Sequence, residues 1–260
     1  MVDMTTEYLG LQLANPLVPS ASPLTADLDT ARRLRDAGAA AMIMPSLFEE
    51  KIEQEEHQLD RFFHQQSIGF GELESFHPVP EHYKTCQEEY LEQLHSLKTA
   101  LDIPVIASLN GTTSGGWIEY GKQLQQAGAD ALELNVYYIA GDETESSADV
   151  EQRYVELLES LQQHVSIPIT MKLSSQFSSP LHVIQRLEQA GAAGVALFNR
   201  FYLPDIDLET LKINPVLNLS SPVESLLRIR WAALLHGRVN LSVAVTGGFH
   251  NAQDLSLIHI

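Results

Sequence analysis

Polar residues stand at the ends of short apolar segments in this chain, where a parallel sheet would collect them at one face. Asn110, Asn135 and Asn199 each close such a segment, and Lys172 lies inside the apolar run 167–173. An unpaired ammonium buried in a strand is very costly, so Lys172 requires a partner and favours a functional role. The asparagines are less specific, because asparagine also ends strands through turn chemistry alone.

A glycine pair, Gly247-Gly248, follows the last apolar segment and precedes what resembles the first turn of a helix. Bare backbone N–H groups at a helix N-terminus bind phosphate, and barrels often place such a site after their seventh and eighth strands. A tight turn without a ligand is the alternative. The position favours a phosphate site.

A repeated junction indicates the elements that must position these residues. Three amphipathic segments end in Ala-Gly-Ala, at residues 37–39, 127–129 and 190–192, and each passes directly into a short apolar segment. A weaker copy contains Gly237. Glycine adopts the positive φ that commonly ends a helix, so each junction predicts a helix followed by a strand. Ser221-Pro222, with Glu224 three residues after the serine, predicts a capped helix start.

This alternation predicts an α/β fold with a parallel sheet whose strands are covered on both faces. We expect a TIM-type (β/α)8 barrel that forms a single domain over residues 1–260, with the last βα unit missing from the chain. Long insertions follow the second strand, at about residues 46–82, and the sixth. Residues 256–260 continue the helical pattern poorly, and a truncated reading frame is one explanation for them. The seven expected strands lie near residues 17–20, 40–45, 104–109, 131–136, 168–173, 194–199 and 242–246.

The charge and the cysteine content of the chain limit its classes of partner and its cellular compartment. The 260 residues include 16 Lys plus Arg and 34 Asp plus Glu, a formal charge of −18. Such a surface repels nucleic acid and anionic membrane, so we expect neither as a partner. Cys86 is the only cysteine, which excludes internal disulfides and fits a cytoplasmic protein; its polar surroundings make it a bystander. No signal peptide or membrane-spanning segment is indicated.

Five motifs occur in order from about residue 6 to residue 253. They are Tyr8-Leu9-Gly10-Leu11 with Asn15-Pro16, Leu132-Glu133-Leu134-Asn135, Met171-Lys172-Leu173, Asn199, and Val245-Thr246-Gly247-Gly248. Together they resemble the dihydroorotate dehydrogenase family. The resemblance implies an FMN-binding barrel that oxidises dihydroorotate to orotate in pyrimidine biosynthesis and that takes a small-molecule substrate, dihydroorotate or a related compound.

The resemblance also implies roles for individual residues. Lys172 would stabilise negative charge on the reduced flavin. Gly247 and Gly248 would bind the FMN phosphate, and Asn135 and Asn199 would hydrogen-bond the substrate. The remaining cofactor contacts would come from Ser20, Ala21 and Ser22 along the flavin ring, and from Ser46, Asn110 and Asn135.

Several positions depart from the family pattern. Pro45 stands where the family has a lysine, and Tyr138 stands where it has a Cys or Ser base. A phenol with a pKa of about 10 is a poor base unless strongly perturbed. Ala140 replaces a substrate-binding asparagine, and Ser220-Ser221 replaces a glycine-rich turn.

Two alternatives to a flavin enzyme therefore stay open. One is a barrel lyase that forms a Schiff base on Lys172. The other is a degenerate barrel that serves as an interaction subunit through the insertion at residues 46–82. The sequence contains no cysteine cluster and no nicotinamide motif, so an iron–sulfur or nicotinamide centre would belong to an electron-transfer partner. It leaves a homodimer open too.

Overall fold

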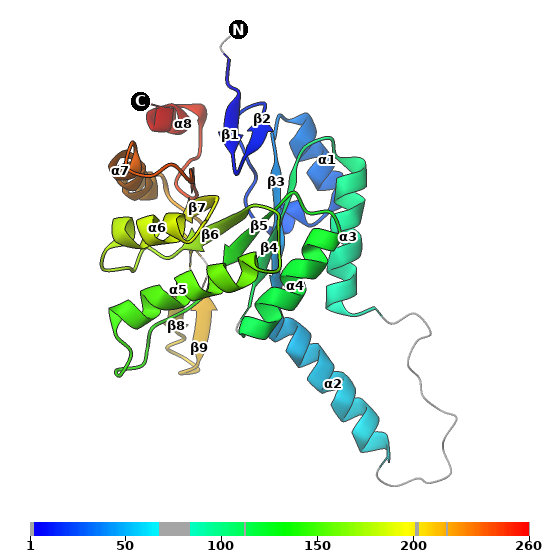
Figure 1. The fold of residues 1–260 in the computed structure, drawn as a ribbon. Coiled ribbons are helices and arrows are strands. Elements are labelled where there is room, and N and C mark those ends of the chain that lie inside the picture. The colour runs from blue at the N-terminus through cyan, green and yellow to red at the C-terminus, as the bar shows by residue number, and fades with distance from the viewer. Residues whose placement is uncertain (1–2, 68–83, 112, 201–202, 217, 260) are drawn as a thin grey trace. The chain divides into compact units, whose positions relative to one another are not determined.

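The computed structural model describes residues 3–67, 84–111, 113–200, 203–216 and 218–259 (Figure 1). Six strands form one sheet in the order β10-β7-β6-β5-β4-β3, with helices between successive strands, so the predicted α/β class with part of a β/α barrel is confirmed. The chain divides into two compact units, residues 17–132 on one side and residues 1–16 with 133–260 on the other. The boundary falls inside β5, and each unit is described by itself.

The unit of residues 17–132 is built around two parallel strands. Ile106 and Leu109 of β4 are fully buried, as are Leu94 and Leu97 of α3, and α3 and α4 pack on β4. The predicted insertion at 46–82 begins as the long helix α2, and its residues 68–83 lie outside the described part of the chain. The elements are η1 (Pro23–Thr25), α1 (Leu28–Asp36), β3 (Met42–Phe48), α2 (Glu49–Ser67), α3 (Cys86–Ala100), β4 (Val105–Asn110) and α4 (Ser114–Gln126).

The second unit begins with a hairpin and continues through the rest of the sheet. Strands β6, β7 and β10 are parallel neighbours, and α7 contacts both β10 and α8. The elements are β1 (Thr6–Tyr8), β2 (Leu11–Leu13), β5 (Ala131–Asn135), α5 (Ser147–Gln162), β6 (Ile169–Leu173), α6 (Pro180–Gln189), β7 (Gly194–Leu197), β8 (Leu203–Ile206), β9 (Ile213–Val216), η2 (Pro222–Glu224), α7 (Ser225–Leu235), β10 (Ser242–Val245) and α8 (Ala252–His259).

The junction glycines behave as predicted. Gly38, Gly128 and Gly191 have φ of 106°, 97° and 95°, and the weaker copy, Gly237, has φ of 69°. At the first junction the Gly38 amide donates to the Arg35 carbonyl and the Ala39 amide to the Leu34 carbonyl, and the next two junctions repeat this pair of bonds. This is the Schellman pattern, which satisfies the last carbonyls of the helix before the chain turns into the strand.

Two expectations about the ends of the fold are wrong. Residues 17–20 are not a strand, although the Leu17 and Pro19 carbonyls accept hydrogen bonds from the Ala40 and Ile43 amides. Pro16 and Pro19 have no N–H, so this segment cannot sustain a ladder of its own. Helix α8 runs through residues 256–259, which were expected to fit a helix poorly; they contain no Pro or Gly to stop it.

Candidate functional site

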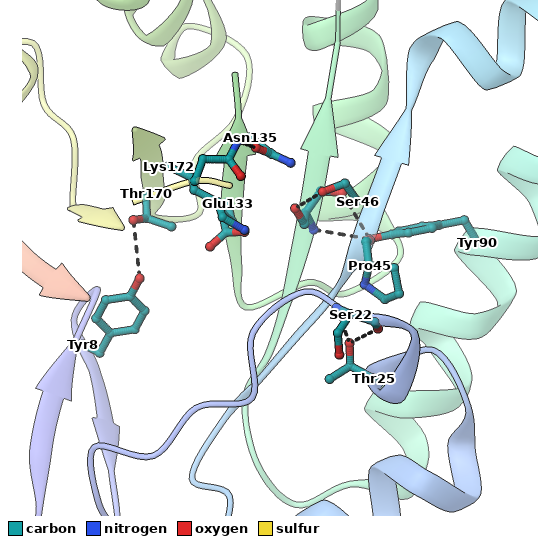
Figure 2. A network of polar contacts seen from close by, with 12 residues as sticks. Tyr8, Ser22, Thr25, Pro45, Ser46, Tyr90, Glu133, Asn135, Thr170 and Lys172 are labelled. Carbon is teal, nitrogen blue, oxygen red and sulfur yellow. Dashed lines mark hydrogen bonds and ion pairs between the residues drawn. The ribbon is translucent and has the colours of Figure 1, made fainter. Parts of the chain in front are cut away.

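The partner that Lys172 requires is Glu133. Lys172 Nζ lies 3.4 Å from Glu133 Oε1, and the two side chains are only 10% and 2% exposed. Glu133 precedes Asn135 by two residues on β5, so both side chains point to the same side of that strand, next to β6 (Figure 2). The expected partner of Lys172 is therefore present, and it comes from the neighbouring strand. Glu133 is the one charged residue within β5.

The two asparagines assigned to the substrate lie together in this unit. The Asn199 side-chain amide donates a hydrogen bond to Asn135 Oδ1, and the Asn199 backbone amide donates to the Leu173 carbonyl at 2.8 Å. The structure therefore brings Glu133 and Asn135 of β5, Lys172 of β6 and Asn199, two residues after β7, together in one unit. Their amide and ammonium groups can donate hydrogen bonds to an anionic or carbonyl-bearing ligand.

The N-terminal hairpin covers the starting ends of the strands that carry these residues. The Tyr8 hydroxyl donates to Thr170 Oγ1 at 3.4 Å, and Thr170 precedes Lys172 by two residues on β6 (Figure 2). Leu9 is 2% exposed, and a Cβ on Gly194 would come within 2.5 Å of it. Burial, more than the nearby Glu133 charge, raises the pKa of Tyr8 well above its usual value. Tyr8 is therefore a neutral donor at this end of the strands.

The glycine pair adopts positive φ values that favour glycine. Gly247 and Gly248 have φ of 84° and 89°, and a Cβ on Gly248 would lie 2.3 Å from the Ser225 amide nitrogen. The start of α7 thus approaches the pair so closely that only glycine fits. Arg228 of α7 donates from Nε to the Thr246 carbonyl at 3.0 Å and fixes this approach. Arg228 could not be recognised from the sequence, since it lies within an ordinary helical segment and belongs to no motif.

Tyr138, assigned with doubt to the base position, is engaged as a hydrogen-bond donor. Its hydroxyl lies 2.5 Å from Glu145 Oε2, and the Arg153 guanidinium lies 4.0 Å from the centre of its ring. The hydrogen bond to Glu145 is the main cause that raises the pKa of Tyr138. A raised pKa makes the phenolate rarer at neutral pH, so this geometry gives no support to the base role.

In the unit of residues 17–132, Pro45 explains the local shape around Ser46. Strand β3 has one extra residue between Ile43 and Ser46 relative to β4, a β-bulge at the proline that cannot donate to the ladder. The Tyr90 hydroxyl donates to the Pro45 carbonyl at 2.8 Å, and Ser46 Oγ lies 2.8 Å from Ser108 Oγ.

The other cofactor contacts expected in this unit are placed as follows. Asn110 ends β4 and is buried, whereas Ser20 is exposed and Ala21 and Ser22 are half-buried. Ser22 accepts a hydrogen bond from Thr25 Oγ1 on its carbonyl (Figure 2). Nothing in this geometry tests their role toward a flavin, which stays a prediction.

Three further features of the described residues bear on function: metal ligands, membrane-spanning helices and the single thiol. Among those residues no group of three or more His, Cys, Asp and Glu side chains is placed to hold a metal ion. None of the helices described has the length and apolar character needed to cross a membrane. Burial is the main cause that raises the pKa of Cys86 to about 11, so this thiol is a weak nucleophile.

Comparison with known proteins gives the class of the fold and a distant relationship. No family model matches the chain. It is 27% identical over 168 residues to catalytic subunits of dihydroorotate dehydrogenase B (NAD(+)) from Bacillus cereus strain AH187 and Bacillus anthracis strain A0248, an alignment of 59% of this chain and 52% of each relative. The chain thus spans about half the length of the curated relatives it matches.

A solved structure agrees on the architecture. An IMP dehydrogenase/GMP reductase-like protein from Corynebacterium glutamicum superposes with a TM-score of 0.54 and 13% identity, covering 99% of this chain and 64% of that one. This likeness shows the fold alone. Together the comparisons support a chain of the β/α-barrel type that is distantly similar to oxidoreductases.

Proposed function

We propose that the chain is an FMN-dependent oxidoreductase of the dihydroorotate dehydrogenase type. The observation that carries the proposal is the buried Lys172–Glu133 pair beside the hydrogen-bonded Asn135 and Asn199. The similarity to dihydroorotate dehydrogenase B catalytic subunits supports the same cofactor and reaction class. The acidic charge and the single cysteine support a cytoplasmic enzyme with a small-molecule substrate.

The residues of the unit that holds these strands fit a flavin mononucleotide in chemistry. Gly247 and Gly248 combine positive φ with a close approach to the start of α7, so their amides can bind a phosphate. Lys172 supplies a fixed cation that would favour negative charge on the ring. When bound, FMN supplies an acceptor for hydride. Ser20, Ala21, Ser22, Ser46 and Asn110 are the remaining proposed contacts.

The substrate side of the proposal depends on amide donors and on proton removal. Asn135 and Asn199 would orient dihydroorotate or a related cyclic amide through their side-chain amides, with the hydrogen bond between them fixing both rotamers. Oxidation of a CH–CH bond also requires a group that accepts a proton. Tyr138 is the residue at that position, and it would have to pass its own proton to Glu145 before its oxygen could accept one from the substrate.

The visible spectrum of the purified protein tests this function. After reconstitution with FMN we expect flavin absorbance that stays with the protein on gel filtration and bleaches on anaerobic titration with dihydroorotate. Absence of bound flavin after reconstitution would refute the cofactor. Bound flavin that does not bleach would keep the cofactor and reject the substrate.

Schiff-base chemistry on Lys172 is less favoured by the geometry. Lys172 Nζ lies 3.4 Å from the Glu133 carboxylate, and this contact would have to be given up before the amine could attack a carbonyl. Borohydride trapping of a substrate adduct on Lys172 would reverse this ranking.

A further inference from the structure

Two arginines meet a single glutamate beside the glycine pair. Arg200 Nη1 lies 3.2 Å from both carboxylate oxygens of Glu224, and Arg228 Nη2 lies 3.6 Å from Oε2 of the same side chain. The same Arg228 nitrogen would be 3.4 Å from a Cβ on Gly247. We call Arg200, Glu224 and Arg228 the arginine cluster. Its members are joined in one continuous set of contacts to the proposed phosphate loop.

The cluster carries a net charge of +1 in a chain whose formal charge is −18. Arg228 is fixed, since its side chain is 6% exposed and it also donates to the Glu224 carbonyl at 3.0 Å. Burial is the main cause that lowers the pKa of Arg228; the Glu224 charge acts in the opposite direction, and the Arg200 charge lowers the pKa further. Both guanidinium groups contact the same carboxylate, and an anion between two like charges favours their charged forms.

Glu224 supplies that anion from within the chain. Besides Arg200 and Arg228, its carboxylate accepts the Ser221 amide at 3.0 Å and completes the capping box at the start of η2. The side chains of Glu224 and Arg200 are 31% and 29% exposed, so both reach solvent, where a ligand can meet them. A phosphate monoester carries more negative charge than a carboxylate and offers three acceptor oxygens to the planar fork of an arginine.

We propose that Arg200 is a ligand for the phosphate of a phosphate monoester, and that Glu224 competes with the phosphate for it. This inference rests on the proposed flavin function, which places a phosphate at Gly247 and Gly248. Arg200 follows Asn199 directly in the chain. The hydrogen bond from Asn199 to Asn135 therefore helps to hold the backbone next to Arg200 in place. Arg228 acts through the Thr246 carbonyl and is a positioning residue.

The competing explanation is that Arg200 only holds two segments of the chain together, a structural role that we call a clip. Arg200 also donates to the Asn218 carbonyl, so it ties down the segment before η2 whether or not a phosphate binds. The two explanations differ in one respect. If Arg200 binds the phosphate, its loss lowers the affinity for a flavin with a phosphate and leaves the affinity for a flavin without one unchanged. If Arg200 is only a clip, its loss changes both affinities alike.

The test compares FMN with riboflavin, which lacks the phosphate, by quenching of flavin fluorescence on the full chain. For Arg200→Gln we expect FMN affinity to fall roughly 10- to 100-fold, the usual effect of losing a hydrogen bond to a charged group, with riboflavin affinity unchanged. For Glu224→Gln we expect FMN to bind several-fold more tightly at constant riboflavin affinity. Arg230→Gln, which removes an exposed charge from α7, is the control for net charge.

Each outcome decides between the ligand and the clip. Equal changes for FMN and riboflavin in Arg200→Gln, or no change in either, would overturn the inference. If Arg200→Gln fails to fold, Glu224→Gln decides by the direction of its effect on FMN alone. If the unaltered chain binds neither flavin, the proposed function fails separately. Line broadening of inorganic phosphate in ³¹P NMR then tests Arg200 directly. Equal broadening by the unaltered chain and by Arg200→Gln would refute the inference.

Discussion

Replacing Lys172 by methionine tests whether burial makes the ion pair with Glu133 important to stability. The substitution keeps an unbranched apolar stem and removes the ammonium group, with its charge and its hydrogen-bond donors. Glu133 then remains as a carboxylate that is 2% exposed, without its cation. Removal of one partner of a buried pair typically costs about 3–5 kcal/mol, because the remaining charge is left uncompensated. We expect the lower half of that range, since the pair is separated by 3.4 Å and Lys172 retains slight exposure.

The double variant Lys172→Met/Glu133→Gln separates the charge from the packing. Once the carboxylate is also gone, no buried charge is left, so we expect the double variant to recover at least roughly 1–2 kcal/mol relative to Lys172→Met. The matched control is the Lys84–Glu92 pair, which is shorter at 2.6 Å but 51% and 59% exposed. Lys84→Met should cost far less than Lys172→Met, because exposed ion pairs contribute little to stability.

The assay is equilibrium urea unfolding at neutral pH and fixed salt, followed by circular dichroism. Lys172→Met, Glu133→Gln, the double variant and Lys84→Met are each compared with the unaltered chain through their midpoints and slopes. Equal losses for Lys172→Met and Lys84→Met would refute the reasoning, since distance rather than burial would then decide. Strict additivity in the double variant would refute it too. A change in slope would signal altered compactness and not a loss of the pair.

Two further predictions concern packing and pH. Gly116→Ala should destabilise the protein by about 1–3 kcal/mol, because its Cβ would lie 1.9 Å from the Glu49 carboxylate. Gly115→Ala is the control: its Cβ would meet nothing within 4 Å, so it should be neutral or stabilise by up to about 1 kcal/mol. Equal melting temperatures for the two variants would contradict this prediction. Burial is the main cause that raises the pKa of Tyr154 to about 12, so above pH 10 the unfolded chain ionises first and stability falls. The loss from this one group is at most about 1.4 kcal/mol per pH unit between pH 10 and 12, and Tyr154→Phe should remove it; an unchanged alkaline slope would show that Tyr154 is not its source.

The parts of the fold that could be predicted are those decided by local chemistry. Gly38, Gly128 and Gly191 end their helices because a positive φ costs glycine nothing, and no distant residue is needed to infer this. The hairpin β1–β2 was missed because its strands have three residues each, too few to show a period. Its two-residue turn places Leu9 and Gly10 at φ of 56° and 76°, and a leucine is an unusual residue for such a conformation.

The parts of the site that could not be predicted depend on partners from distant segments. Burial of Lys172 implies some anion, but its identity as Glu133 follows only once β5 and β6 are known to be neighbours. The hydroxyl that contacts the bulge at Pro45 comes from Tyr90, 45 residues along the chain. Nothing near Pro45 in the sequence specifies it.

The two candidate ligand-binding cations of this unit share one property that bears on function. Lys172 is matched by Glu133, and Arg200 is matched by Glu224, so each has a carboxylate from the same unit as its partner. A ligand phosphate must therefore compete with Glu224 at Arg200, where both partners reach solvent, whereas the Lys172–Glu133 pair is buried inside the sheet. The contribution to FMN affinity that depends on salt should accordingly come from the phosphate, while the buried Lys172 ammonium acts on the flavin ring at short range. If so, raising the salt concentration should weaken FMN binding and leave riboflavin binding almost unchanged, because exposed charges are screened far more than buried ones.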